Sequence, residues 1–427
     1  MTFLSRLAKG VSITRVAEAP DLLDDGSYDS FYRRVRTGGD ESIDGTFETV
    51  YKSNGIVFAC IGARMMPFSE VRFQFQRFVK GRPSELFGDP ALDLLESPWV
   101  NGSTGELLAR MEQDASLAGN FYATPIDVGG ERWVQRLRPD RVRIVSGIPD
   151  QRASSATLGA RVLGYIYDPG GDENPIFLTP DRVVHYSPIP DPEANWRGMS
   201  WLQPLANEIR ADTAATRHKE RYFTNGAALS TVVRYDKDLS PDRFRQYVAL
   251  FEENHTGPAN AYKTLHIGGG ADVSVIGSAL TTDFRLVQGA GETRIAAAAG
   301  VGAVIARFSE GLQGSALNQG NYTAAKRQFG DMTLRPLWRT AAAALSKLVR
   351  PPAGARLWYD PRDVEFLKDD RKDAAEIAQM TASTMSTLIT AGFTPESVVT
   401  AVETGDMTRL AHSGLYSVQL QRVGTPT

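Results

Sequence analysis

The stretch WLQPLANEIRADTAATRHKERYFT, residues 201–224, carries the strongest architectural signal in the chain. Apolar and small side chains recur in it at a spacing of three to four residues, which predicts one amphipathic helix. Its 24 residues would extend roughly 36 Å, which is long for a helix inside a globular domain. The Asn225 and Gly226 pair is a typical helix stop. The stripe comprises Leu202, Leu205, Ile209, Thr213, Thr216 and Phe223.

The sequence before this helix predicts both helices and strands. Residues 46–66 and 105–119 have helical periodicity, and residues 71–76 alternate apolar and polar side chains as a strand does. Residues 120–186 contain six short β-like runs separated by Gly, Pro and Asp turns, which predicts an antiparallel β-rich region. Residues 1–45 have weak periodicity and are expected to form a loosely ordered arm.

The sequence after it predicts a small module and then more helix. Residues 228–277 fit a strand, a helix over 241–255 and two further strands. A helix is expected over 281–306, a polar loop over 309–321, and a long helix from Asn321 that Pro336 should bend or break near Leu334. A strand around Leu357 to Tyr359 and helices over 369–391 and 395–403 complete an α+β chain.

Composition narrows the class of protein. The chain has 427 residues, of which 42% are hydrophobic and 23% charged, so most of it should be globular. The formal net charge of −3 argues against tight binding of nucleic acid by bulk electrostatics. The single cysteine, Cys60, lies in an apolar run and is expected to be a buried thiol. The N-terminus lacks the apolar core of a secretory signal, and the longest apolar stretch, 295–306, is too short to span a bilayer, so we expect no export and no membrane contact.

Residues that could carry chemistry do not assemble into a recognisable motif. The five histidines have no metal-ligand spacing, and Ser200 and Ser315 lack a nucleophile elbow. The glycine-rich stretches at 268–273, 289–294 and 300–305 match neither a P-loop nor a dinucleotide fingerprint, and turns or close helix contacts are favoured. An arginine run is interrupted by Glu131 and Asp140, which favours a solvated or intersubunit sheet face over a nucleic-acid contact. The run consists of Arg132, Arg136, Arg138, Arg141 and Arg143.

Nine stretches, which together cover about residues 47–350, occur in the order found in one protein family. They are SNGIVFACIGARMM (53–66), SLAGNFYATPI (116–126), RLRPDRVRIV (136–145), LTPDRVVHYSPIP (178–190), WRGMSWLQPLANEI (196–209), RYFTNGAAL (221–229), FEENHTGPANAYKTLHIGGG (251–270), TDFRLVQGAGETRIAAAAGV (282–301) and NYTAAKRQFGDMTLRPLWRTAAAAL (321–345). On these stretches the chain resembles the portal, or head-to-tail connector, family of tailed phages, in the branch associated with chainmail capsids.

The resemblance implies a portal fold with an α/β wing, a helical stem, a small α/β clip and a helical crown, assembled as a ring. By order, the expected parts are an N-terminal arm (1–45), the first part of the wing (46–200), a stem helix (201–227), the clip (228–277), a second stem helix with its connection (278–306), a tunnel loop (307–321), a wing spine helix (322–350), and the end of the wing with the crown and tail (351–427).

It also implies a function without catalysis, metal or cofactor. Such a ring, typically of twelve subunits, sits at the capsid vertex of the virion and passes double-stranded DNA during packaging and ejection; before that it is assembled in the host cytoplasm. The implied partners are the terminase large subunit, the major capsid protein and a head-completion or neck adaptor. An alternative from the residues alone is a nucleotide- or cofactor-using multidomain enzyme built on the glycine-rich turns.

Within the parts that the resemblance implies, we hypothesise three sets of site residues; an ordinary surface loop and an ordinary solvated helix face are the alternatives for the first and second sets. Gln313, Ser315, Asn318 and Gln319 would touch passing DNA from the tunnel loop. Arg243, Arg245, Glu252 and Glu253 would form the docking face of the clip for terminase or the adaptor. Leu202, Leu205, Ile209 and Phe223 would pack the stem against a neighbouring subunit.

Overall fold

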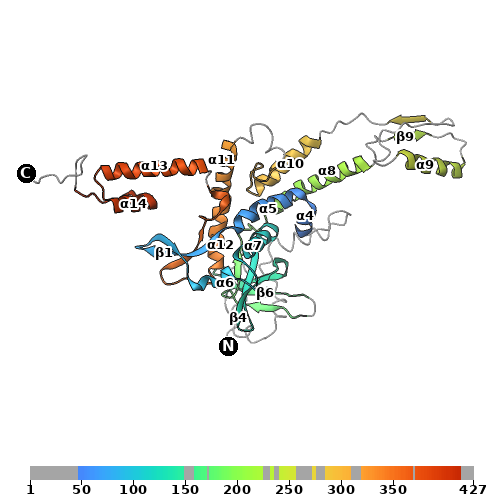
Figure 1. The fold of residues 1–427 in the computed structure, drawn as a ribbon. Coiled ribbons are helices and arrows are strands. Elements are labelled where there is room, and N and C mark those ends of the chain that lie inside the picture. Colours follow the sequence, from blue (N-terminus) through green and yellow to red (C-terminus); the bar gives the residue numbers. More distant parts are fainter. Residues whose placement is uncertain are drawn as a thin grey trace, which may run out of the picture. The chain divides into compact units, whose positions relative to one another are not determined.

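Short antiparallel strands form all of the sheet structure among the residues that this computed structural model describes, which are 47–148, 158–170, 173–224, 231–234, 240–255, 272–275, 284–308, 319–368 and 371–414. The chain divides into two units, Met1–Val364 and Glu365–Thr427. Within each described range the mixture of helices with antiparallel strands agrees with the predicted α+β class (Figure 1).

Two three-stranded sheets build the β-rich region of the first unit. Their strand orders are β4-β3-β8 and β5-β6-β7. The strands are β3 (Phe121–Val128), β4 (Glu131–Leu137), β5 (Val142–Gly147), β6 (Arg161–Tyr167), β7 (Ile176–Leu178) and β8 (Val184–Tyr186). One apolar cluster joins the two sheets because alternate residues of each sheet point inward. It consists of Tyr122, Leu137, Val142, Ile144, Tyr165 and Val183. The predicted antiparallel β-rich region is confirmed.

A third sheet joins the two ends of the first unit. β1 (Arg72–Val79) pairs with the adjacent β2 (Arg82–Phe87) and with the distant β11 (Ala355–Asp360). The register places Phe75 opposite Leu357, and both are buried. The alternation in the sequence predicts β1 and β11, but it does not predict β2, whose residues are mostly exposed.

Helices α4 (Phe47–Ser53) and α5 (Gly55–Ser69) replace the single helix predicted over 46–66. The break is at Asn54, whose side chain accepts hydrogen bonds from the backbone N–H groups of Ile56 and Val57, both at 3.0 Å. Asn54 therefore caps the N-terminus of α5 and ends the run from α4. Helix α7 (Thr104–Ala118) packs on α5 and ends at Gly119, as predicted. The short α6 (Asp93–Glu96) lies between β2 and α7 in the sequence.

Helices α8 (Ala206–Thr224) and α10 (Phe284–Ala298) lie side by side (Figure 1). The prediction that one helix starts at Trp201 is wrong: a turn and a 3₁₀ segment, Gln203–Leu205, come first. The Ser200 hydroxyl accepts a hydrogen bond from Leu202 N, which favours a turn before the helix. The helix predicted over 281–306 also ends early, because Gly300 adopts φ +70° and the chain continues in turns.

The module predicted over 228–277 is described in part. β9 (Thr231–Arg234) pairs with β10 (Asp272–Val275), and α9 (Pro241–His255) lies between them in the sequence. The helix predicted over 241–255 is confirmed, and α9 has the same first and last residues. The strand predicted over 262–267 lies outside the described residues.

A long helical run completes the core of the first unit. α11 (Gln319–Phe329) and α12 (Arg335–Leu345) are joined by a π-helical segment, Gly330–Leu334. This irregularity confirms the predicted break: Pro336 has no N–H and its ring crowds the preceding turn, so the backbone widens there. Trp338 of α12 is fully buried, and its Nε1–H donates to the backbone oxygen of Phe68.

In the second unit, α13 (Arg371–Thr390) packs with α14 (Pro395–Thr404). The predicted pair of closing helices is confirmed, although Asp369 at the predicted start lies outside the described residues. The backbone N–H of Thr394 donates to Ala411 O, which fixes the segment after α14 to the turn between the helices.

Candidate functional site

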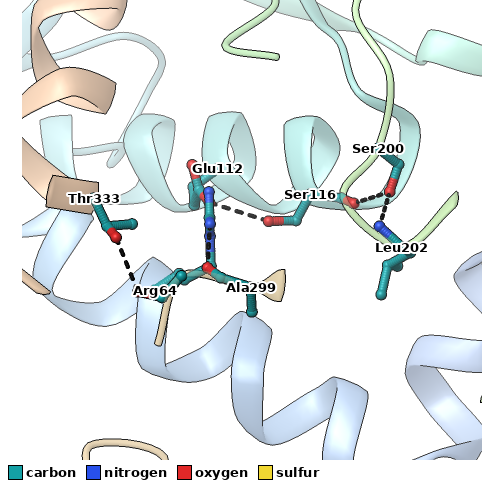
Figure 2. Close-up of polar contacts among 8 residues, drawn as sticks. Arg64, Glu112, Ser116, Ser200, Leu202, Ala299 and Thr333 are labelled. Atoms are coloured by element: carbon teal, nitrogen blue, oxygen red, sulfur yellow. Dashed lines mark hydrogen bonds and ion pairs between the residues drawn. The ribbon is translucent and has the colours of Figure 1, made fainter. Parts of the chain in front are cut away.

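A buried ion pair links α5 to α7 where the two helices pack. The Arg64 Nε atom lies 2.7 Å from Glu112 Oε1, and the side chains are 6% and 0% exposed. Arg64 also donates from Nη1 to the backbone oxygen of Ala299, just beyond the end of α10. Figure 2 shows Arg64 between Glu112 and Ala299. The guanidinium thus holds the last turn of α10 against α7.

The same network reaches the segment that leads into α8. Ser116 Oγ donates to Glu112 Oε1 at 3.0 Å, and Ser200 Oγ donates to the backbone oxygen of Ser116 (Figure 2). Ser200 Oγ in turn accepts from Leu202 N at 3.0 Å. We call the side chains of Arg64, Glu112, Ser116 and Ser200 the polar junction. It fixes the start of one long helix and the end of the other to the same helix, α7.

Two contacts near the polar junction extend this anchoring. The Asn54 side-chain amide donates to Asp212 Oδ2 at 2.8 Å, which connects the cap of α5 to the second turn of α8. Thr333 Oγ1 donates to the backbone oxygen of Gly300 at 2.9 Å, which connects the π-helical segment to the end of α10. Both long helices are therefore held at more than one point.

Two glycines form the closest backbone approach at this site. Gly119 has φ +73°, and a Cβ there would lie 2.4 Å from the carbonyl carbon of Met199; a Cβ at Gly198 would lie 2.4 Å from Gly119 O. Asn120 fastens the contact: its side chain accepts from Gly198 N and donates to Gly198 O, both at 2.8 Å. Only glycine permits backbones to lie this close.

His185 completes the Asn120 contact. Its Nε2 lies 3.0 Å from Asn120 Oδ1, and its ring stacks on Tyr122 with centroids 4.5 Å apart. Burial, with the nearby cations Arg197 and Lys347, lowers the pKa of His185 to about 3, so the ring is neutral at physiological pH. Asn120 Oδ1 is a carbonyl oxygen, which also accepts from Gly198 N, so it can only accept a hydrogen bond from His185. The proton of the neutral ring is therefore on Nε2. His185 is a structural histidine, as the sequence favours.

Cys60 is a buried free thiol on α5, in agreement with the prediction. Burial raises its pKa to about 12, against a smaller opposing effect of Arg64. A thiol that stays protonated is a poor nucleophile.

Arg136, Arg138 and Arg141 of the arginine run form ion pairs or hydrogen bonds with other groups of the same chain. Arg136 makes a bidentate ion pair with Asp114 of α7, at 2.6 and 2.5 Å. Burial raises the pKa of the Asp114 carboxyl despite this partner. Arg138 makes a second bidentate pair with Asp140, and Arg141 donates to the backbone oxygen of Pro169. Guanidinium groups that are held in these contacts are less available to bind the phosphates of a nucleic acid.

The described residues contain no cluster of His, Cys, Asp and Glu that could hold a metal ion. Across those same ranges, no helix is both long enough and apolar enough to cross a membrane. The polar junction itself offers no open site for a reacting group, because its members are buried and bonded to one another. The geometry is that of a rigid connection between helices.

Comparison with known proteins gives this connection a context. The family model for phage portal proteins matches residues 56–388, which includes the polar junction and most of the chain. The chain belongs to the phage portal protein family. The resemblance inferred from the sequence stretches is thereby confirmed.

Solved structures support the same portal fold. The chain is 23% identical to a chain in the neck of an empty gene transfer agent (GTA) particle computed with C6 symmetry. The TM-score is 0.56, and the match covers 86% of this chain and 94% of that one. A chain in the neck of the native GTA particle, computed with C12 symmetry, gives 22% identity and a TM-score of 0.53 over 84% and 94%. An HK97 family phage portal protein from Corynebacterium diphtheriae gives 12% identity and a TM-score of 0.50 over 74% and 96%. No curated protein matches the sequence.

The predicted stem-packing residues divide into two groups. Leu202, Leu205 and Ile209 are buried within the chain itself, with 0%, 8% and 4% of their surface exposed. The Phe223 side chain lies outside the described residues, although α8 includes its backbone. From Arg210 to Arg221 no residue of α8 is buried, so any packing of this half against a neighbour would use surface that the chain leaves open.

The predicted clip and tunnel residues are described only in part. Arg243 and Arg245 are exposed on α9, and Arg245 pairs with Asp242 at 3.1 Å. Glu252 and Glu253 belong to α9, but their side chains lie outside the described residues. Of the residues predicted for the tunnel loop, Gln319 is the first residue of α11, and its side chain is also outside the described residues. Gln313, Ser315 and Asn318 lie outside the described residues altogether.

The polar junction was not predicted from the sequence, although its residues lie in the stretches that suggest the family. Arg64 belongs to SNGIVFACIGARMM, Ser116 to SLAGNFYATPI and Ser200 to WRGMSWLQPLANEI. The available signal was chemical: Arg64 is a lone charge on an apolar helix, and a buried charge requires a partner. Which partner it has depends on chain packing.

Proposed function

We propose that copies of the chain, typically twelve, form the ring at one capsid vertex through which double-stranded DNA is packaged and later ejected. The observation that carries the proposal is the match of residues 56–388 to the portal family. The similarity to neck chains of particles computed with C6 and C12 symmetry supports a cyclic assembly in the virion. Assembly of the ring in the host cytoplasm would precede this location.

The parts of the ring follow from the order of the elements. We assign the wing to 46–200, the stem to 201–227 and 278–306, the clip to 228–277, the tunnel loop to 307–321, the spine to 322–350, and the end of the wing with the crown to 351–427. In this assignment the polar junction joins wing to stem. A rigid connection suits a conduit, because both stem helices must keep their position while the motor pushes DNA past them.

The tunnel loop would touch DNA weakly. Gln313, Ser315, Asn318 and Gln319 have amides and a hydroxyl, which contact phosphates without charge-assisted ion pairs. Replacing all four by Lys should slow or stall packaging in a motor assay. Four Ala replacements are the matched control and should have a smaller effect. Packaging at the normal rate with the Lys variant would refute this role.

The clip would dock the terminase large subunit and later the head-completion or neck adaptor. The exposed Arg243 and Arg245 support this, together with Glu252 and Glu253 of the same helix. Reversing the four charges should abolish capture of terminase in a pull-down, while reversal of Arg82 and Glu85 on β2 should not. Retained capture by the clip variant would remove the assignment. The major capsid protein is the expected partner of the wing.

The test of the proposed function is the assembly state of the purified full chain. Mass photometry should find a species of about twelve times 46.6 kDa, and negative-stain images should show rings with an axial hole. We expect no intrinsic nucleotide hydrolysis and no thermal stabilisation by nucleotides or cofactors. A monomer at all concentrations, stabilised by such a ligand, would favour the alternative of an enzyme.

A further inference from the structure

The outward side of α5 has an unusual composition for a helix at a protein surface. Arg64 is the only charged residue of this 15-residue helix, and its side chain points inward to Glu112. On the opposite side, Phe58 is 56% exposed and Met66 is 63% exposed. We call the residues on this side the α5 outer face; they are Phe58, Ala59, Gly62, Met65 and Met66, which are exposed or partly exposed.

Neighbouring helices show what a solvated face looks like in this chain. The exposed positions of α7 include Glu106 and Arg110, and α8 exposes Arg210 and Arg217. A helix that is apolar on all sides is normally buried on all sides. The α5 outer face therefore differs in composition from the solvated faces of α7 and α8.

We propose that the α5 outer face is a contact surface for a second copy of this chain. The inner side of α5 is already occupied by α7 and by the end of α10. In a cyclic ring each subunit buries two different patches, one for each neighbour. This inference rests on the proposed ring, and it assigns one of those patches.

The chemistry of the face favours this occupant over others. It carries no charge, and permanent interfaces between copies are depleted in charged residues and rich in Phe and Met. Nucleic acid would require cationic side chains, which the face lacks. A helix of 15 residues is also too short to span a bilayer.

Gly62 provides a shallow point on the face between Phe58 and Met66. A Cβ added at Gly62 would meet no atom within 4 Å. A side chain placed there projects away from its own chain, so it would obstruct a neighbour without disturbing the fold. This makes position 62 the most selective place to test the contact.

The first arm of the experiment compares Gly62→Glu with Gly62→Ala in the full chain. Mass photometry at one fixed protein concentration should show the ring fraction lowered about tenfold or more by Gly62→Glu. Gly62→Ala, which adds only a methyl group and favours helix, should keep the ring. Circular dichroism and thermal unfolding should show both variants folded. Equal ring fractions in the two variants would overturn the proposal.

The second arm identifies what covers the face. A photoreactive benzoylphenylalanine in place of Phe58 should yield dimers and higher multimers on a denaturing gel, with peptides that join two copies. A crosslink within one copy, for example to residues 1–46, would overturn the proposal in favour of the chain's own N-terminal segment. Rings without any intersubunit crosslink would overturn it and leave the proposed function standing. Absence of rings in the unmodified chain would refute the ring, and with it this contact.

Discussion

Arg64 shows at the scale of one residue how the chain connects its parts. A guanidinium that is 6% exposed has lost most of its hydration, and this loss is offset by Glu112 and the backbone oxygen of Ala299. Such a pair adds little to the net free energy of folding, because the attraction between the charges mainly offsets their lost hydration. It restricts how the helices pack, because any packing that separates Arg64 from Glu112 would leave a buried charge without a partner. The polar junction therefore specifies where α10 ends against α7.

Removal of one member of this pair should be costly. We expect Glu112→Ala to lower the free energy of unfolding by about 3–5 kcal/mol, because Arg64 would remain buried without its anion. Urea unfolding followed by tryptophan fluorescence measures the loss. The control is Arg245→Ala, which breaks a pair whose side chains are 76% and 88% exposed and should cost less than about 1 kcal/mol. Equal losses in the two variants would contradict a structural role of the polar junction.

Gly119 allows a second prediction at this scale. Gly119→Ala should destabilise the chain more than Gly81→Ala, although both glycines have similar left-handed conformations at φ +73° and +77°. Both variants lose roughly 1–2 kcal/mol for that conformation. Only at Gly119 does the new Cβ meet backbone, 2.4 Å from Met199, and this adds about 1–3 kcal/mol. Thermal unfolding of the two variants measures the difference, and similar midpoints would argue against the close approach.

At the scale of elements, α8 changes character along its length. Its first two turns are anchored by the buried Ile209 and by the contact of Asp212 with Asn54. The remainder, to Arg221, has no buried residue, and isolated helical segments of this length are marginal in water. The surface that α8 leaves open beyond its contact with α10 is available to a further partner.

Amide hydrogen exchange should reveal this partner. In isolated subunits, residues 213–221 should exchange much faster than those of α7, since none of them is buried whereas many α7 residues are. In the assembled ring their exchange should slow by about tenfold or more, because neighbouring stem helices would cover them. The α7 amides are the internal control and should change little. Equal exchange in the two states would contradict the assignment of α8 to the stem.

At the scale of the whole molecule, net charge predicts the kind of contact with DNA. A formal charge of −3 per subunit, repeated around a ring, gives no overall attraction to a polyanion. Arg136 and Arg138 of the basic run are moreover paired with carboxylates of the same chain. These features suit a conduit that lets DNA slide without holding it.

The assembled ring should accordingly bind free double-stranded DNA weakly. We expect a Kd no tighter than about 10⁻⁶ M at physiological salt, without sequence preference, measured by fluorescence anisotropy with a labelled duplex. The fourfold Lys variant of the tunnel loop is the matched control and should bind more tightly, with a steeper dependence on salt. Nanomolar binding by the unmodified ring that is insensitive to salt would contradict a weakly attractive channel.

The sequence by itself determined the features that depend on local pattern. Periodicity and turn residues predict α7 with its stop at Gly119, the antiparallel β-rich region, α9, and the irregularity at Pro336, and the order of the stretches indicates the portal family. Each of these signals lies within a few tens of residues, where backbone sterics and alternation of burial act directly.

Only the tertiary structure decided how these stretches meet. Periodicity continues through Asn54 and Trp201, and it does not show that an Asn side chain caps α5 or that a Ser hydroxyl delays the start of α8. The partners Arg64 and Ala299 are 235 residues apart, and β1 pairs with a strand that is still farther away in the sequence. The cost of burying a charge or of bringing two backbones into contact depends on what packs against them, and that is a property of the folded chain.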